Sequence, residues 1–298
     1  MRAMIRGVAL ATLLATLLAG LGGAAASAGA PPLAIVAAEN VYGDVAEQIA
    51  GPDATVTSIL SNPAQDPHMF EASPSVARDL ANARIVVANG AEYDPWIDKL
   101  LGASRSATRT TITVAELVHA RPGGNPHLWY DPATMPAYAQ ALAAALAAAD
   151  PAHKAGYEAR RQTFLASLRP LDDKVRALRE KIAGTPVTAT EPVFGPMAAA
   201  LGLAMRNERF QIAVMNDTEP SAADVAAFED DLRGHRVKLL LYNSQASDAA
   251  AQRLLDIARA EKIPVVGVTE TEPAGTHFQD WMLGELDAVA AALSRAGT

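Results

Sequence analysis

The chain of 298 residues contains no cysteine and no excess of positive charge. Without cysteine it cannot form a disulfide scaffold, a thiolate zinc site or an iron–sulfur cluster, and it cannot use a thiol nucleophile. The 33 acidic and 25 basic residues give a formal net charge of −8, and no basic stripe is present that could neutralise nucleic-acid phosphates. Any bound metal must therefore be held by histidine, carboxylate or amide groups.

Several catalytic signatures are also missing. The mature sequence has no G-x-S-x-G elbow, no G-x-x-x-x-G-K-[ST] phosphate loop and no H-E-x-x-H zinc helix, which argues against a nucleophilic or nucleotide-binding enzyme. With 50% hydrophobic residues, the chain has the composition of an ordinary globular protein of one or two domains.

Residues 1–30 have the features of a secretory signal peptide. Arg2 and Arg6 precede an uncharged run over 8–21, and small residues follow it. This run is shorter than the roughly 20 apolar residues that a membrane-spanning helix needs, so cleavage after Ala28 or Ala30 is expected. The predicted product is a protein exported to a bacterial periplasm.

After residue 30, short Val- and Ile-rich runs alternate with stretches of helical periodicity, which is typical of βα units around parallel sheets. Strands are predicted at 33–37, 55–60, 84–88 and 110–114 in the first half, and at 186–190, 237–242 and 264–269 in the second. A helix is predicted over 91–102, and others open near Phe194, Ser221, Ala246 and Phe278.

A helical segment separates the two halves. Residues 151–183 are charged and carry apolar residues at helical spacing, with Pro170 expected to kink the helix. The predicted organisation is an N-terminal α/β lobe over 31–150, a connector helix over 151–183 and a C-terminal α/β lobe over 184–298. A single large sheet with a surface helix is the alternative that this pattern leaves open.

Two Pro-His dipeptides lie in loops of the first half. His68 follows Pro67 after the predicted strand 55–60, and His127 follows Pro126. Proline stiffens the backbone, and ligands gather at the carboxyl ends of strands in open α/β sheets. Either histidine alone could be an ordinary surface residue, but the pair favours a shared ligand.

Carboxylates occupy similar places in the second half. Glu191 follows the predicted strand 186–190, and Glu270 follows 264–269. A carboxylate carried into a cleft loses its hydration, and a bound cation offsets that cost. Taken singly, each could instead be a solvated loop acid or a charge at a helix N-terminus.

Four motifs, taken in order, resemble a known family. D-P-H-M-F-E at 66–71, N-P-H-L-W-Y-D at 125–131, V-T-A-T-E at 187–191 and V-T-E-T at 268–271 are similar to motifs of the metal-binding solute-receptor family of bacterial ABC importers for manganese, zinc and iron (cluster A-I). The resemblance covers nearly the whole mature chain. It implies two α/β lobes joined by a rigid helix, with one divalent metal ion bound between them.

Carried over position by position, the resemblance gives His68, His127, Glu191 and Glu270 as the metal ligands, with Glu272 as the second choice for the last one. Zinc receptors of the family usually have a third histidine where Glu191 stands and a His-rich loop between the first two ligands, and neither is present here. Chelating carboxylates would raise the coordination to five or six, which suits manganese or ferrous iron, although zinc binds most such sites tightly.

The predicted function is a non-enzymatic periplasmic receptor that captures a divalent transition metal (Mn²⁺ or Zn²⁺, or Fe²⁺) as a monomer and delivers it to an ABC permease. Two alternatives stay open: a secreted metal-dependent hydrolase that uses the same residues, and a periplasmic metal chaperone that serves another protein. Against the hydrolase, four protein ligands that include chelating carboxylates would leave little room for the water that such an enzyme needs.

Overall fold

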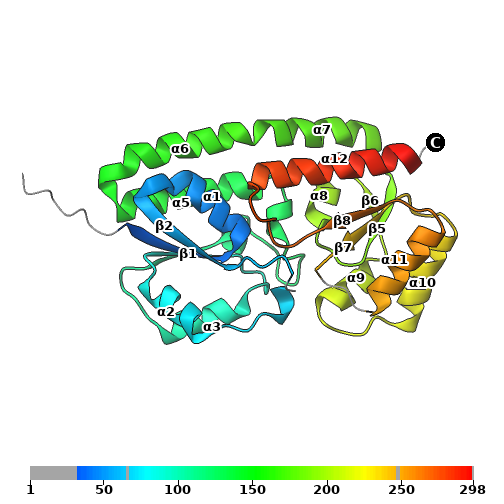
Figure 1. Cartoon of the computed structure of the whole chain (residues 1–298), viewed down its shortest axis with the longest axis horizontal. Coiled ribbons are helices and arrows are strands. Elements are labelled where there is room, and N and C mark those ends of the chain that lie inside the picture. Colours follow the sequence, from blue (N-terminus) through cyan, green and yellow to red (C-terminus); the bar gives the residue numbers. More distant parts are fainter. Residues whose placement is uncertain (1–31, 65–66, 246–248, 297–298) are drawn as a thin grey trace, which may run out of the picture. The chain divides into compact units, whose positions relative to one another are not determined.

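Alternating apolar strands and amphipathic helices build two parallel sheets (Figure 1). The computed structural model describes residues 32–64, 67–245 and 249–296, and the side chains of His68 and Ala296 are outside this description. The predicted signal peptide, residues 1–30, also lies outside the described residues. The predicted fold class, two α/β lobes with mainly parallel sheets, is confirmed.

The first lobe contains β1 (Leu33–Glu39), α1 (Asn40–Ala50), η1 (Gly51–Asp53), β2 (Ala54–Leu60), η2 (Pro67–Met69), α2 (Pro74–Asn82), β3 (Ile85–Ala88), α3 (Pro95–Ala103), β4 (Thr110–Thr113), α4 (Val114–Leu117), η3 (Leu128–Tyr130) and α5 (Thr134–Ala149). After η4 (Pro151–His153), α6 (Lys154–Ser167) and α7 (Arg169–Ile182) lead to the second lobe. That lobe contains β5 (Pro186–Ala189), α8 (Gly195–Ala200), β6 (Ala204–Arg206), α9 (Glu208–Met215), α10 (Ala222–Arg233), β7 (Leu240–Asn243), α11 (Ala249–Ala260), β8 (Val265–Val268) and α12 (Phe278–Ala296).

The first βα unit illustrates how the residue pattern gives this fold. Val41, Val45 and Ile49 recur every four residues along α1, and all three are fully buried, so one face of the helix packs against the sheet. Gly51 ends the helix with a φ of 58°, a left-handed conformation that glycine adopts without a steric penalty.

The strand orders are β2-β1-β3-β4 and β6-β5-β7-β8, with all neighbours parallel. In the first sheet the chain moves from β1 outward to β2 and then returns to β3 on the other side of β1, so the strand order reverses between β1 and β3. In the second sheet the same reversal lies between β5 and β7. Ligands of open α/β sheets bind outside the carboxyl ends of the strands at such a reversal. The two reversals therefore mark where a binding site is expected.

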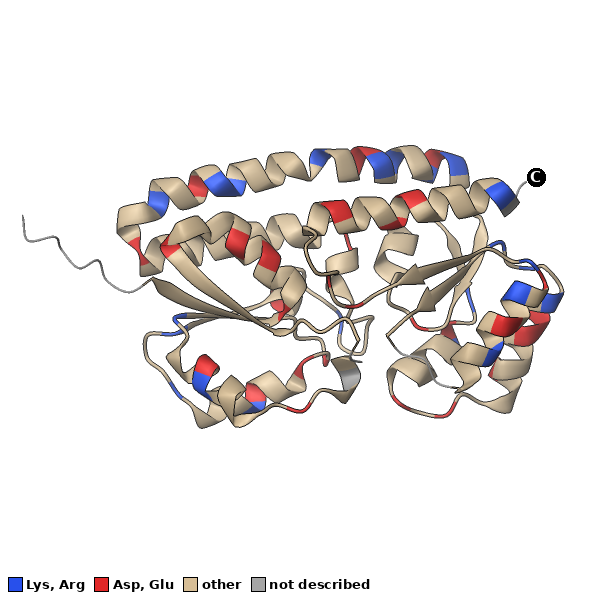
Figure 2. Cartoon of the chain, viewed as in Figure 1, with Lys and Arg blue, Asp and Glu red and all other residues tan. Residues whose placement is uncertain are grey.

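The segment between the sheets is helical but not continuous. The helices α6 and α7 are separated at Leu168, and Pro170 lies in the first turn of α7, where its missing N–H needs no partner. Basic and acidic residues are interspersed along α7 (Figure 2), while Leu171, Val175 and Leu178 are buried. The helix α12 packs along α7 and also against β8 of the second sheet.

An apolar core joins the two lobes. The ring of Tyr130, from the first lobe, contacts those of Phe194 and Trp281 at centroid distances of 5.5 and 5.7 Å. The hydrophobic cluster that contains these residues also includes Ile35 of β1 and Leu241 of β7. A large apolar interface restrains relative lobe motion. Within the described residues, no helix is both long and apolar enough to cross a bilayer.

Some local predictions were wrong. The helix predicted from residue 91 begins at Pro95, because Ala91 and Glu92 have φ values of 51° and 65° and turn the chain before the helix starts. Strand β6 and helix α9 were not predicted. Strand β6 has only three residues and α9 only eight, which is too short for a clear periodic pattern.

Glu285 of α12 gives a prediction for stability. Burial raises the pKa of Glu285 to about 8, although Tyr130 and Trp281 donate hydrogen bonds to it at 3.0 and 2.9 Å. Because the folded pKa lies above the unfolded one, the folded protein loses stability as pH rises from about 4.5 through about 8, by roughly 5 kcal/mol in total. Glu285→Gln should remove this dependence.

The test is urea denaturation of both proteins at pH 5 and pH 9. Between pH 5 and pH 9, the wild type should lose stability relative to Glu285→Gln. The exposed acid of the same helix, Asp287, provides the control Asp287→Asn. An equal difference between wild type and Glu285→Gln at both pH values would contradict the prediction.

Candidate metal centre

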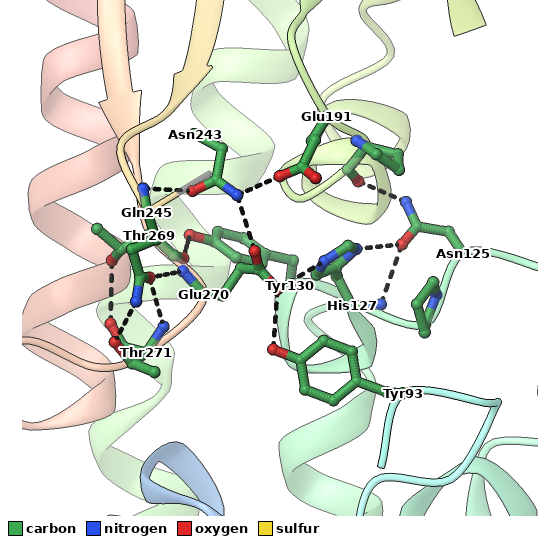
Figure 3. Close-up of polar contacts among 12 residues, drawn as sticks. Tyr93, Asn125, His127, Tyr130, Glu191, Asn243, Gln245, Thr269, Glu270 and Thr271 are labelled. Carbon is green, nitrogen blue, oxygen red and sulfur yellow. Dashed lines mark hydrogen bonds and ion pairs between the residues drawn. The ribbon is translucent and has the colours of Figure 1, made fainter. Parts of the chain in front are cut away.

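Three adjacent strands of the second sheet bring polar side chains to one edge. Glu191 follows β5, Asn243 is the last residue of β7, and Glu270 follows β8. All three are buried, with exposures of 3%, 0% and 1%. The Nδ2 atom of Asn243 donates to Glu191 Oε2 and, at 2.7 Å, to Glu270 Oε1 (Figure 3). The sheet topology thus places two predicted ligands around one amide group.

The first lobe contributes His127 to the same place. His127 is fully buried, and its Nε2 atom lies 3.2 Å from Glu270 Oε2. The hydroxyl of Tyr93 donates to that same carboxylate oxygen at 2.9 Å. Three of the four predicted ligands therefore lie together, His127 against Glu270 directly and Glu191 through Asn243 (Figure 3).

Asn125 fixes the orientation of the His127 ring. Its Oδ1 atom accepts the backbone N–H of His127 at 3.0 Å and lies 2.8 Å from His127 Nδ1, while its Nδ2 atom donates to Pro192 O at 2.5 Å. Because these contacts define which end of the amide is oxygen, Nδ1 of His127 carries a hydrogen. Nε2 is left to face Glu270, in the orientation that a metal ligand requires.

The loop that carries Glu270 is held from both lobes. Gln245 Oε1 accepts the backbone N–H groups of Glu270 and Thr271 at 2.6 and 3.0 Å. From the first lobe, the Tyr130 hydroxyl donates to Thr269 O at 2.7 Å (Figure 3). The backbone position of Glu270 is therefore set before any ligand arrives, which lowers the cost of ordering it on binding.

Glu272, the second choice for the fourth ligand, lies in a different environment. Burial, together with the charges of nearby Asp44 and Glu47 of α1, raises the pKa of Glu272 to about 9. Its backbone N–H and C=O are paired with the side chain of Asn40, at 3.0 and 2.8 Å. Glu270 is thus the acid of this loop that contacts His127.

His277, which follows Glu270 by seven residues, pairs with Asp44 of α1 instead of with Glu270. Its Nδ1 atom lies 2.5 Å from Asp44 Oδ1. This contact raises the pKa of His277 through the hydrogen bond and the charge of Asp44.

For His68, the fourth predicted ligand, the structure describes only the backbone. Its backbone belongs to η2, and its side chain lies outside the described residues. Without it, the described side chains include no group of three or more His, Asp or Glu residues that could hold a metal ion. The four-ligand set therefore stays a prediction.

Sequence reasoning missed three residues of this centre: Tyr93, Asn125 and Asn243. Asn125 was visible as the first residue of the N-P-H motif, and Asn243 follows the predicted strand 237–242 directly. Asking which polar residue ends each strand would have found Asn243. No sequence signal marked Tyr93.

The chemistry of this arrangement favours binding of a cation. The two buried carboxylates repel each other and have lost hydration, and both effects disfavour their charged forms. A cation bound between them would offset both costs. A neutral imidazole supplies nitrogen, and the carboxylates supply oxygen, which together suit a divalent transition metal.

Comparisons with known proteins agree with this chemistry. A family model described as "ZnuA: Zinc-uptake complex component A periplasmic" matches residues 35–292. The chain is 24% identical over 231 residues to the iron-binding protein YfeA of Yersinia pestis, covering 74% of this chain and 72% of that protein. It is 23% identical over 287 residues to the manganese ABC transporter substrate-binding lipoprotein PsaA of Streptococcus anginosus, covering 88% and 90%.

Solved structures share the fold. The periplasmic zinc-binding protein TroA from Treponema pallidum superposes with a TM-score of 0.76 at 20% identity, covering 89% of this chain and 99% of that one.

Proposed function

The chain belongs to the ZnuA family of periplasmic zinc-uptake components, and from this premise we propose that it binds one divalent transition-metal ion between its lobes and delivers it to a membrane permease. The proposed ligands are His68 and His127 from the first lobe and Glu191 and Glu270 from the second. Members of this family are solute-binding components of ABC transporters and not enzymes, so the hydrolase alternative is set aside.

The contact between His127 and Glu270 carries the proposal. These residues come from different lobes and lie 143 positions apart, yet a ring nitrogen and a carboxylate oxygen approach to 3.2 Å at a fully buried place. A cation bound there would draw on nitrogen from one lobe and oxygen from the other. Binding would then stabilise the contact between the lobes, because an ion that binds only the folded arrangement favours it.

Family membership does not determine which metal this chain binds. The relatives named above are described as binding iron and manganese, and the structural neighbour as binding zinc, so family membership leaves the choice open. A set of two imidazoles and two carboxylates suits zinc, manganese and ferrous iron.

Release is proposed to occur by local change rather than by wide opening. The continuous apolar core between the lobes disfavours large rigid-body motion. Movement of the loop around Glu270 would be enough to remove one ligand, and docking to the permease is the proposed trigger. The protein is proposed to act outside the cytoplasmic membrane, since members of its family are periplasmic components.

The test is equilibrium dialysis of the purified, metal-stripped protein against Zn²⁺, Mn²⁺ and Fe²⁺, with the bound metal measured by mass spectrometry. One ion per chain is expected, with no second site of similar affinity. Metal uptake by proteoliposomes that contain the partner permease and ATPase then separates a receptor from a chaperone, because only a receptor is required for that uptake. Absence of binding for all three ions would overturn the proposal.

A further inference from the structure

Asn243 lies at the centre of the predicted ligand set without being part of it. It ends β7, the strand between β5 and β8, and it is fully buried. Its backbone N–H donates to Thr190 Oγ1 at 3.0 Å, which fixes the main chain at the carboxyl edge of the sheet. The side chain therefore projects between Glu191 and Glu270 from a rigid position (Figure 3).

The orientation of the amide is determined by its neighbours. Asn243 Oδ1 accepts the backbone N–H of Gln245 at 3.0 Å. A flipped amide would place its NH₂ group against that N–H and its oxygen against two carboxylate oxygens, so all three hydrogen bonds would be lost. The NH₂ group must therefore face the acids.

Both hydrogens of this NH₂ group are used. A primary amide has two N–H donors, and here one is directed to Glu191 Oε2 and the other to Glu270 Oε1. One oxygen of each carboxylate is thus engaged by Asn243. The other oxygen of Glu270 is the one that faces His127 Nε2 and the Tyr93 hydroxyl.

We infer that Asn243 determines metal specificity at this centre by keeping Glu191 and Glu270 monodentate. This inference rests on the proposed function. A dication chelated by both oxygens of either acid would approach the positive end of the amide dipole, so binding through the remaining oxygen is favoured. Two monodentate acids and two imidazoles give four-coordination, which is the preferred geometry of zinc.

The residue types alone favour a different metal from the one that the contacts of Asn243 favour. Carboxylates free to chelate raise the coordination to five or six and suit manganese or ferrous iron. The engaged oxygens remove that freedom, and Asn243 is the residue responsible. It positions the ligands and does not itself bind the ion.

The test compares wild type with Asn243→Ala, which removes the amide. Affinities for Zn²⁺ and Mn²⁺ are measured by competition with a chromophoric chelator. The ratio of the two dissociation constants should shift toward manganese by at least about tenfold in the variant, since losing a group that orients metal ligands typically changes affinity by about 10- to 100-fold. The exposed Asn216 provides the control Asn216→Ala, in which the ratio should not change.

Co²⁺ substitution gives a second readout that a purely structural role would not alter. Four-coordinate Co²⁺ absorbs strongly in the visible region, and higher coordination weakens this band. Wild type should show the strong band, and Asn243→Ala a weaker one. Asn243→Leu keeps about the size of the side chain but has no N–H donor and no ligand atom, and it provides the comparison if the alanine variant does not fold.

The outcomes separate the two claims. If wild type binds none of the metals, the proposed function fails. If wild type binds metal but the ratio and the Co²⁺ spectrum are unchanged in the Asn243 variants, the proposed function stands and this inference is overturned.

Discussion

Glu270→Gln is expected to lower the affinity for Zn²⁺ by about 100- to 4000-fold, whereas Glu272→Gln leaves it within about threefold. Removing the charge of a buried acid that faces a cation costs about 3–5 kcal/mol, and each 1.4 kcal/mol is a factor of ten. Glu270 lies against His127, but the carboxyl of Glu272 lies near Asp44 and Glu47 instead.

The two variants form a matched pair. Both replace a buried glutamate in one loop by its neutral amide. Glu272 has a pKa of about 9, so it is already protonated at neutral pH and glutamine changes its charge little. Calorimetric or competition titration at pH 7 measures both. A large loss in Glu272→Gln with none in Glu270→Gln would place the fourth ligand at residue 272.

Saturating Zn²⁺ is expected to raise the melting temperature of the wild type by about 10 °C. A ligand present at about a thousand times its dissociation constant stabilises the folded state by about 4 kcal/mol. For a protein of this size, each kcal/mol raises Tm by about 2–4 °C. In His127→Ala, where the proposed nitrogen ligand of the first lobe is lost, the shift should fall below about 3 °C.

His277→Ala is the control for that experiment. His277 pairs with Asp44, so its removal should leave the zinc-induced shift in place even if it lowers the starting Tm. Differential scanning calorimetry with and without metal measures both variants. An unchanged shift in His127→Ala would show that this imidazole does not bind the ion.

Much of the fold could be predicted because apolar spacing alone specifies its elements. The spacing of Val41, Val45 and Ile49 at every fourth residue is typical of one buried helix face, and all three are fully buried. A helix was predicted to open near Ser221, and Ser221 caps α10, accepting the Asp224 N–H at its Oγ at 3.1 Å. The start of α3 was missed because the turn before it depends on Asp94, whose carboxylate accepts the N–H groups of Asn89 and Gly90.

The centre itself could be predicted only in part. The rule that ligands gather at the carboxyl ends of strands pointed to Glu191 and Glu270, which lie around one amide in the structure. It did not point to Asn243, because an amide is not a typical ligand for these metals and its role arises from tertiary contacts. The choice between Glu270 and Glu272 likewise depended on tertiary packing, which places the carboxylate of Glu270 against His127 and that of Glu272 near α1.

We propose that four side chains from two lobes surround one ion, and a crystal structure of the zinc-loaded protein with anomalous data at the zinc edge would show whether they do. One strong anomalous peak is expected within bonding distance of His68, His127, Glu191 and Glu270. A peak elsewhere, or one that contacts residues of a single lobe only, would contradict it.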